Sequence, residues 1–300
     1  MKTLKQAIQE AEKKKIAIGH FNIATLEQLE AIARAAIKLD VPVIIGVSEG
    51  EREYLGISHI YDFVASYNKE YGDVSTNAGF WLFLNADHTH SLEKVKEAAE
   101  VGFNEILFDA SKLPFKENIK ETKKAVKIIK KIAVRQRKEI LIEGELGYIG
   151  SSSQLLKKVP PGVAICPEDF TKPEDANTFV RETGIDLLGP AVGNVHGMFK
   201  NARNPRLDIE RIREIKKAVK IPLVLHGGSG ISDEDFLAAI DAGISIIHIS
   251  TEIRLVWRKG LEESLKEHPG EVAPYKVMPE VIGEIEKVVE QRLRLFNKIP

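Results

Sequence analysis

The chain is poor in the features that mark secreted and membrane proteins. It has one cysteine, Cys166, among 300 residues, which excludes a disulfide within the chain and fits a reducing compartment. No apolar run approaches the roughly 18–20 residues that a membrane-spanning helix needs. The N-terminal stretch MKTLKQAIQE is amphipathic and lacks the apolar segment of a secretory signal. We therefore expect a cytoplasmic protein.

The chain also lacks an excess of charge of either sign. The 43 lysines and arginines nearly balance the 44 aspartates and glutamates, and the formal net charge is −1. Because the basic residues are spread along the sequence, neither a nucleic acid nor a membrane surface is expected as a partner. An anionic small molecule would have to be held by a local site.

Length and composition bound the domain organisation. A hydrophobic fraction of 43% is enough for a sizeable core. A chain of 300 residues suits one large domain or two small ones. We see no linker and no internal repeat, so we predict a single domain over residues 1–300.

Short apolar runs alternate with helical patterns along most of the chain. Eight runs are predicted strands: 16–23, 41–48, 81–87, 105–109, 140–146, 186–192, 223–226 and 244–250. Several are apolar throughout, which is typical of parallel strands covered by helices. Eight alternations favour an α/β fold of the closed (β/α)₈ TIM-barrel type over an open doubly wound sheet, although the pattern alone does not show closure.

Helix start and stop signals fall between these strands. Thr25 and Gln28 form a capping box, and helices are predicted after Ser91, over 118–137, over 208–219 and after Ser232. Two stretches do not fit a minimal barrel. Residues 147–172, rich in Ser, Pro and Gly, are predicted to be a long loop of the kind that often carries function. The region from Leu261 onward is predicted to be a C-terminal helical extension.

Histidines gather at the predicted strand ends, where the active sites of barrels lie. Five of the eight are placed there, whereas His20, His59 and His268 are not; the five are His88, His90, His196, His226 and His248. One such histidine is more often structural, but three at one barrel mouth predict a catalytic zinc site with an open coordination position. Asp109 and Glu145 are candidates to orient the rings or to bind the metal directly, or are ordinary barrel carboxylates. These patterns leave open whether His88 or His90 is the ligand.

A glycine-rich loop follows the seventh predicted strand. The segment His226-Gly-Gly-Ser-Gly230 leads into the helix capped by Ser232. Glycines let backbone N–H groups approach a phosphate closely, and this is a common phosphate site in barrels. Thr251 could add a hydroxyl from the next strand end. A simple turn is the alternative, but the adjoining His226 favours a phosphate site.

Taken together, these segments resemble the class II fructose-bisphosphate and tagatose-bisphosphate aldolases over nearly the whole chain. The most specific segments are Asp87-His88, Phe108-Asp-Ala-Ser-Lys-Leu-Pro-Phe115, Glu143-Gly-Glu-Leu-Gly147, Gly193-Asn-Val-His-Gly-Met198 and Leu225-His-Gly-Gly-Ser-Gly230. The resemblance implies a lyase of carbohydrate metabolism that acts on a ketose bisphosphate, with fructose 1,6-bisphosphate as the first expectation. It also implies a homodimer or homotetramer.

The resemblance further implies roles for individual residues. His88, His196 and His226 would bind Zn²⁺, with a monovalent cation as a further expectation, and Asp87 would transfer the proton. The residues expected to contact substrate and its phosphate are Ser48, Gly197, Gly227, Gly228, Ser229, His248, Ile249, Ser250 and Thr251.

The chain departs from the family pattern at two places. The loop after the fifth strand lacks the family's acidic residues over 150–154, and Glu168 or Asp169 could reach in from further along the chain. His248 stands where the family has an asparagine. Both departures predict an unusual ketose phosphate or a weakened aldolase. The alternatives are another barrel metalloenzyme, such as a hydrolase with a metal-bound water, and a non-catalytic sugar-phosphate-binding protein.

Overall fold

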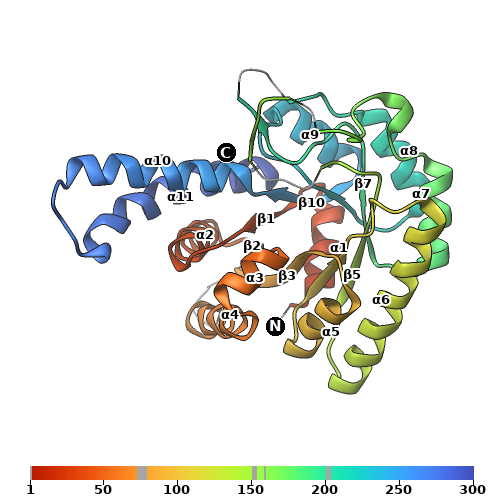
Figure 1. Cartoon of the computed structure of the whole chain (residues 1–300), viewed down its shortest axis with the longest axis horizontal. Helices are drawn as coiled ribbons and strands as arrows, with labels where there is room; N and C mark the ends of the chain where they lie inside the picture. Colours follow the sequence, from red (N-terminus) through yellow and green to blue (C-terminus); the bar gives the residue numbers. More distant parts are fainter. Residues whose placement is uncertain (1, 73–79, 151–153, 159, 201–203) are drawn as a thin grey trace.

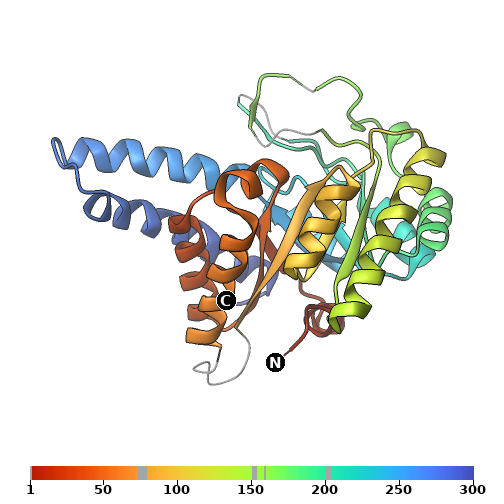
Figure 2. The ribbon, with the colours of Figure 1, turned by 60° about the horizontal axis from the view of Figure 1, so that its bottom comes forward.

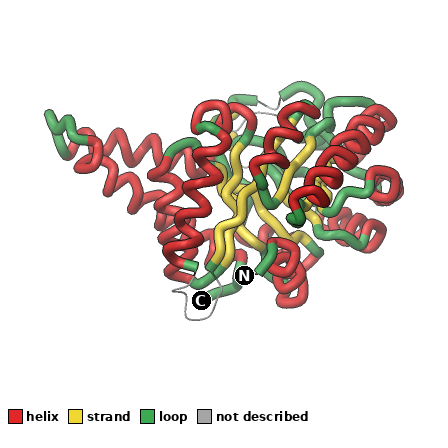
Figure 3. The backbone as a smooth tube through the Cα atoms, turned by 90° about the horizontal axis from the view of Figure 1, so that it is seen from below, coloured by secondary structure: helices red, strands yellow, loops and turns green. Residues whose placement is uncertain are grey.

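The computed structural model describes residues 2–72, 80–150, 154–158, 160–200 and 204–300. Within these ranges eight parallel strands close into a barrel in the order β1-β10-β9-β7-β5-β4-β3-β2, and helices surround it (Figures 1 and 3). The strands are β1 (Ile18–Asn22), β2 (Pro42–Val47), β3 (Trp81–Thr89), β4 (Glu105–Phe108), β5 (Leu141–Leu146), β7 (Leu187–Pro190), β9 (Leu223–Leu225) and β10 (Ile244–Ile249). The predicted TIM barrel is confirmed, and because β1 pairs with both β2 and β10 the open sheet is excluded.

Three helices begin at the capping residues that predict them, and α6, predicted from residue 118, begins at Phe115. Thr25 accepts a hydrogen bond from the Gln28 N–H in a capping box, Ser91 caps α5 and Ser232 caps α9. The helices are α1 (Leu4–Lys14), α2 (Leu26–Leu39), α3 (Glu49–Leu55), α4 (Ile57–Tyr71), α5 (Leu92–Val101), α6 (Phe115–Gln136), α7 (Pro173–Thr183), α8 (Ile209–Val219), α9 (Asp233–Ala242), α10 (Thr251–Glu267) and α11 (Pro274–Phe296).

Two expectations about the irregular regions need correction. The C-terminal helices are present, but α10 begins at Thr251, directly after β10, rather than near Leu261, because the helix that covers the eighth strand continues without a break. It runs out from the barrel and α11 returns beside it to pack against α2 (Figure 1). The predicted loop at 147–172 contains β6 (Leu155–Leu156), paired with β8 (Met198–Phe199), and a 3₁₀ turn, η1 (Pro167–Asp169). Among the described residues, none of the helices combines the length and apolarity needed to cross a bilayer.

The lower end of the barrel interior is apolar. Helix α1 closes this end, and the loop at 147–172 lies at the opposite end (Figure 2). The residues that pack there are Leu4, Ala7, Ile8 and Ala11 of α1 with Ile18, Ile44, Phe83, Leu141, Leu187, Val224 and Ile246 of the strands. This packing supplies the hydrophobic support on which the site is built.

A polar layer lies above this apolar layer. Because side chains alternate along a strand, residues two positions beyond the apolar ones again point into the barrel. The polar layer consists of His20, Asn85, Glu105, Glu143 and His248, all of them buried. Two glycines make room for it: a Cβ on Gly46 would lie 2.0 Å from His20 Cε1, and one on Gly189 would lie 2.9 Å from His226 Cδ2.

Candidate metal and substrate site

A polar cavity of about 320 Å³ opens at the C-terminal ends of the strands. Most of the residues predicted to form the site line it: Ser48, Asp87, His88, Asp109, His196, Gly197, Gly227, Ser229, His248, Ser250 and Thr251. Glu145, His226, Gly228 and Ile249 do not line it. Glu145 lies buried beside His88, Ile249 packs into the hydrophobic core, and the Gly228 N–H donates to the His248 carbonyl at 3.0 Å. The structure therefore brings the predicted proton-transfer residue, predicted metal ligands and the predicted phosphate contacts together at one barrel mouth.

Three imidazoles and a carboxylate converge at the base of this cavity; His88 and His196 line it, whereas His226 and Glu145 are buried beside them. His88, Glu145, His196 and His226 each offer a ligand atom, and these atoms lie within 4.8 Å of one another. Among the described residues, His88 Nε2, His196 Nε2 and His226 Nδ1 are buried without a hydrogen-bond partner, as are both Glu145 oxygens. Buried polar atoms are rarely left unpaired, and several converging on one point fit a bound ion. Three histidines and a carboxylate suit a divalent metal such as zinc.

Carboxylates hold two of the rings from behind. His226 Nε2 lies 2.8 Å from Glu143 Oε1, with both side chains fully buried, and His88 Nδ1 lies 2.9 Å from Asp109 Oδ2. Asp109 also accepts hydrogen bonds from the N–H and hydroxyl of Ser111. Such partners fix the tautomer and leave the other nitrogen for a metal. The sequence analysis named Glu143 only within a motif; its alternation with Glu145, which turns both side chains inward, was the available signal.

The backbone at His88 brings neighbouring residues to the same cavity. His88 has a φ of 40°, in the left-handed region, and the pairing of β3 with β4 shifts between Ala86 and Thr89. Asp87 and His88 can therefore both face the cavity, as expected at a strand end. Such a conformation costs roughly 1–3 kcal/mol and is typical of functional sites. His90 is largely exposed and does not belong to the ligand cluster, so the geometry favours His88 over His90.

Their surroundings shift the pKa values of the three histidines in different directions. Burial lowers the pKa of His196 well below its usual range and lowers that of His226 to about 3, so both rings are neutral and able to bind a metal. Burial also opposes charge on His88, but Asp87, Asp109 and Glu145 outweigh it and raise its pKa. A metal must therefore displace a proton from His88, and its binding weakens as the pH falls.

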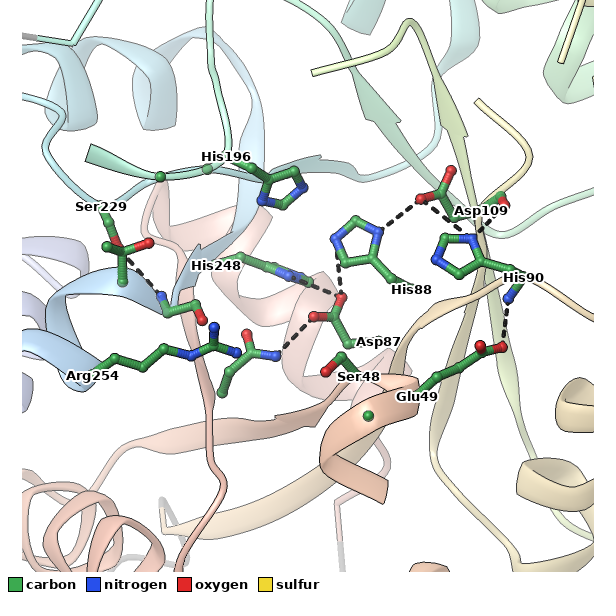
Figure 4. A pocket seen from close by; sticks show the side chains of 16 residues that line it. Ser48, Glu49, Asp87, His88, His90, Asp109, His196, Ser229, His248 and Arg254 are labelled. Atoms are coloured by element: carbon green, nitrogen blue, oxygen red, sulfur yellow. Dashed lines mark hydrogen bonds and ion pairs between the residues drawn. The ribbon is translucent and has the colours of Figure 1, made fainter. Parts of the chain in front are cut away.

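Asp87 is a buried carboxylate beside the proposed ligands. Its Oδ2 accepts a hydrogen bond from Asn22 at 2.8 Å, and its Oδ1 lies 3.6 Å from His248 Nδ1 and 3.8 Å from His88 Nε2 (Figure 4). Burial alone would raise the pKa of Asp87, but His88, His20, His226 and the Asn22 hydrogen bond together hold it below its usual range. Asp87 is thus an ionised proton acceptor at the cavity wall.

A network that the sequence analysis missed supports Asp87 from outside. The Asn22 amide that donates to Asp87 also donates to Glu51 Oε2 at 3.1 Å. Glu51 further accepts hydrogen bonds from the N–H and hydroxyl of Ser48 and pairs with Arg254 at 2.7 Å. Nothing local in the sequence indicated that Glu51 and Arg254 meet.

A wall suited to binding an anion lies across the cavity from Asp87. Gly197, Gly227, Ser229, Ser250 and Thr251 line it, and α10 begins there. Ser229 Oγ accepts hydrogen bonds from the N–H groups of Ser250 and Glu252, and the Ser250 hydroxyl is buried without a partner among the described residues. The N-terminus of a helix together with backbone N–H groups and hydroxyls attracts phosphate.

Some predicted features fall elsewhere. Glu168 and Asp169 lie on η1 and border a separate cavity of about 450 Å³, away from Asp87. The comparison of the loop at 150–154 with the family rests on 151–153, which are outside the described residues. Cys166 is exposed and does not line the site.

Comparisons with known proteins agree over the whole chain. Residues 2–299 match the family model described as "Fructose-bisphosphate aldolase class-II". The chain is 33% identical over 296 residues to a fructose-bisphosphate aldolase of Geobacillus stearothermophilus, covering 98% of this chain and 96% of that one. A fructose-bisphosphate aldolase of Staphylococcus aureus strain Mu50 is 32% identical over 295 residues, with the same coverage. The crystal structure of the YdjI aldolase from Escherichia coli K12 superposes with a TM-score of 0.79 at 29% identity, covering 99% of this chain and 97% of that one.

Proposed function

The chain belongs to the class II fructose-bisphosphate aldolase family, a family of carbon–carbon lyases that generally use a divalent metal, and we propose that it cleaves fructose 1,6-bisphosphate to dihydroxyacetone phosphate and glyceraldehyde 3-phosphate with bound zinc. One observation carries this proposal. Unpartnered nitrogens of His88, His196 and His226 converge beside the carboxylate of Asp87 and opposite the anion-binding wall.

His88, His196 and His226 would hold the metal, with Glu145 as a fourth donor or as a residue that orients the ligands. When bound, a divalent ion supplies a Lewis acid that polarises the ketone carbonyl and stabilises the negative charge left when the carbon–carbon bond breaks. Glu143 and Asp109 hold the His226 and His88 rings with the correct nitrogen inward.

Asp87 moves the proton. In the cleavage direction its carboxylate takes the proton from the hydroxyl on C4, the C3–C4 electron pair passes to C3, and C4 becomes the aldehyde carbon. In the condensation direction Asp87 returns that proton. Asn22 holds Oδ2, so Oδ1 is the oxygen that remains to accept the proton.

The two ends of a ketose bisphosphate need separate anion contacts. The wall of Gly197, Gly227, Ser229 and the start of α10 would hold one phosphate and so anchor the substrate away from the reacting bond. Arg254 would meet the other, since it is the only lysine or arginine that lines the cavity within the described part of the chain.

Other parts of the proposal concern the setting of the enzyme. We propose one domain over 1–300 that acts in the cytoplasm without nucleic-acid or membrane partners, and the monovalent cation stays a prediction. Leu265, Val272 and Tyr275 are exposed on α10 and α11 and in the turn between them, which favours a homodimer or homotetramer formed through these helices.

His248, in place of the family asparagine, favours a second candidate substrate, tagatose 1,6-bisphosphate or another ketose phosphate, in the same reaction.

A panel of ketose phosphates, assayed by coupled release of the triose products, tests the proposal. We expect chelation to abolish cleavage, zinc to restore it, and Asp87→Ala to remove it while zinc stays bound. A chain that binds zinc but cleaves none of the panel, with Asp87→Ala indistinguishable from the parent, would exclude an aldolase and favour a metal-dependent hydrolase or a binding protein.

A further inference from the structure

Two histidine rings stack in the polar layer beneath the proposed site. His20 on β1 is the register partner of His248 on β10, so the two side chains leave neighbouring strands on the same face. Their ring centroids lie 3.4 Å apart, and their planes differ by 3°. His248 lines the cavity, whereas His20 does not. His20 therefore supports His248 from below.

The barrel is built to admit the His20 ring. A Cβ on Gly46 would lie 2.0 Å from His20 Cε1 and 2.5 Å from its Nε2, far inside ordinary contact, so the ring occupies the space that a side chain on β2 would need. Neither His20 nitrogen has a hydrogen-bond partner within the described ranges. The His20 ring instead packs its face against the ring of His248.

The parallel stacking of these rings also excludes a second metal ion bound by both of them. His20, Asp87 and His248 offer ligand atoms within 4.8 Å of one another. However, the lone pair of an imidazole nitrogen lies in the plane of its ring. Two parallel rings 3.4 Å apart cannot both aim a lone pair at one ion, because the ion cannot lie in both planes.

His248 is held between the stack and the reacting groups. Its Nδ1 lies 3.6 Å from Asp87 Oδ1, and its ring centroid lies 4.0 Å from that of His226. Its Nε2 is buried without a partner in the described part of the chain. If the ring turned or sank toward the space of His20, it would leave Asp87.

We propose that His20 is a positioning residue, which holds His248 against Asp87 and the reacting carbons and so makes the His20–His248 pair a determinant of turnover and of the ketose phosphates accepted. This rests on the proposed aldolase function. Gly197, Gly227 and Ser229 of the phosphate wall lie outside β1 and β10, so loss of the stack disturbs the reacting centre and leaves the anchoring of the substrate largely intact.

Steady-state kinetics of the zinc-loaded enzyme test the proposal through a double-mutant cycle. We expect His20→Ala to lower kcat by roughly tenfold or more and to change KM by less than about threefold. His20→Phe, which keeps a flat ring in the slot, should keep most of the turnover. In the His248→Asn background, His20→Ala should have little further effect, because the residue through which it acts is gone.

A matched control separates positioning from general damage to the core. Ile18 lies on the same strand, two residues below His20 and on the same inward face, so Ile18→Val should cost stability and leave kcat unchanged. Circular dichroism and zinc content are measured for each protein. Should His20→Ala not fold, His20→Asn takes its place with the same expectations.

The outcomes separate this inference from the function on which it rests. If the parent enzyme turns over and His20→Ala matches it, or lowers kcat equally in the His248→Asn background, His20 is not a positioning residue and the aldolase assignment stands. Loss of a second bound ion from His20→Ala would overturn the inference in favour of a metal site. A zinc-loaded parent that cleaves no ketose phosphate would overturn the proposed function itself, and the inference with it.

Discussion

Replacing Gly46 by alanine should destabilise the protein through a single contact in the barrel. The added Cβ would lie 2.0, 2.5 and 3.0 Å from three atoms of the His20 ring, whereas ordinary contacts are 3.4–4 Å. The ring cannot retreat, because His248 stacks on its face at 3.4 Å. Overpacking of this kind costs about 1–3 kcal/mol. Gly46 is not among the glycines with positive φ, so the backbone itself accepts a Cβ and the expected cost comes from the ring.

The same substitution should be nearly harmless once the ring is removed. In the His20→Ala background the new methyl group enters vacated space, and the cost of Gly46→Ala should fall below about 0.5 kcal/mol. The coupling between the two positions should therefore be at least about 0.5 kcal/mol. Gly283→Ala in α11 is the control: a Cβ there meets nothing within 4 Å, and the change should stabilise the protein by about 0.5–1 kcal/mol.

Equilibrium urea unfolding of the chelated protein measures these values for the parent, both single variants, the double variant and the control. An unchanged unfolding free energy for Gly46→Ala alone would show that the His20 ring leaves room for a Cβ at position 46. Additive effects in the double variant, within about 0.5 kcal/mol, would show that the clash is not with His20.

Four further outcomes follow from the site. His226→Ala should abolish zinc retention and turnover, whereas His59→Ala, on the exposed surface, should change neither; full activity of His226→Ala under chelation would contradict the metal assignment. Ser229→Ala should raise KM for a phosphorylated substrate about fivefold through the loss of one hydrogen bond, and an unchanged KM would count against the phosphate wall. Arg254→Gln should raise KM for a ketose bisphosphate by about tenfold and affect a ketose monophosphate much less; equal effects on both would show that Arg254 does not bind the second phosphate. Burial and Glu143 raise the pKa of Glu105 well above its usual value, so the folded state keeps a proton that the unfolded state releases above about pH 4.5. As the pH rises from 5 to 8, the unfolding free energy of Glu105→Gln should therefore increase relative to that of the parent by up to about 1.4 kcal/mol per pH unit; urea unfolding curves of the chelated proteins with a pH-independent difference would refute the shift.

Local patterns in the sequence predicted much of the architecture. All eight barrel strands lie within two residues of the predicted runs, and Thr25, Ser91 and Ser232 cap helices as expected. These signals are local, since alternation, helical periodicity and capping each act over a few neighbouring residues. The start of α10 at Thr251 was missed because the helix that covers the eighth strand continues without a break into the C-terminal extension.

The sequence also placed the reacting groups at the correct end of the fold. His196 and His226 follow strands, the pair of Asp87 and His88 lies near the end of β3, and all parallel strands of a barrel deliver their ends to one mouth. The sequence did not indicate which of His88 and His90 points toward the proposed metal site. It depends on the positive φ of His88, which a non-glycine residue adopts only under the constraint of its surroundings.

Only the tertiary structure decided which polar side chains meet inside the barrel. His20 was set aside because it stands in mid-strand, yet closure of the barrel through β1 and β10 brings it face to face with His248. Glu51 and Arg254 likewise come from α3 and α10, which are remote in the chain. Such contacts depend on the register between strands and on the packing of distant helices, and no periodicity within one segment encodes either. The sequence by itself determined where the strands end and which chemical groups stand there; the closure of the barrel determined which of those groups touch.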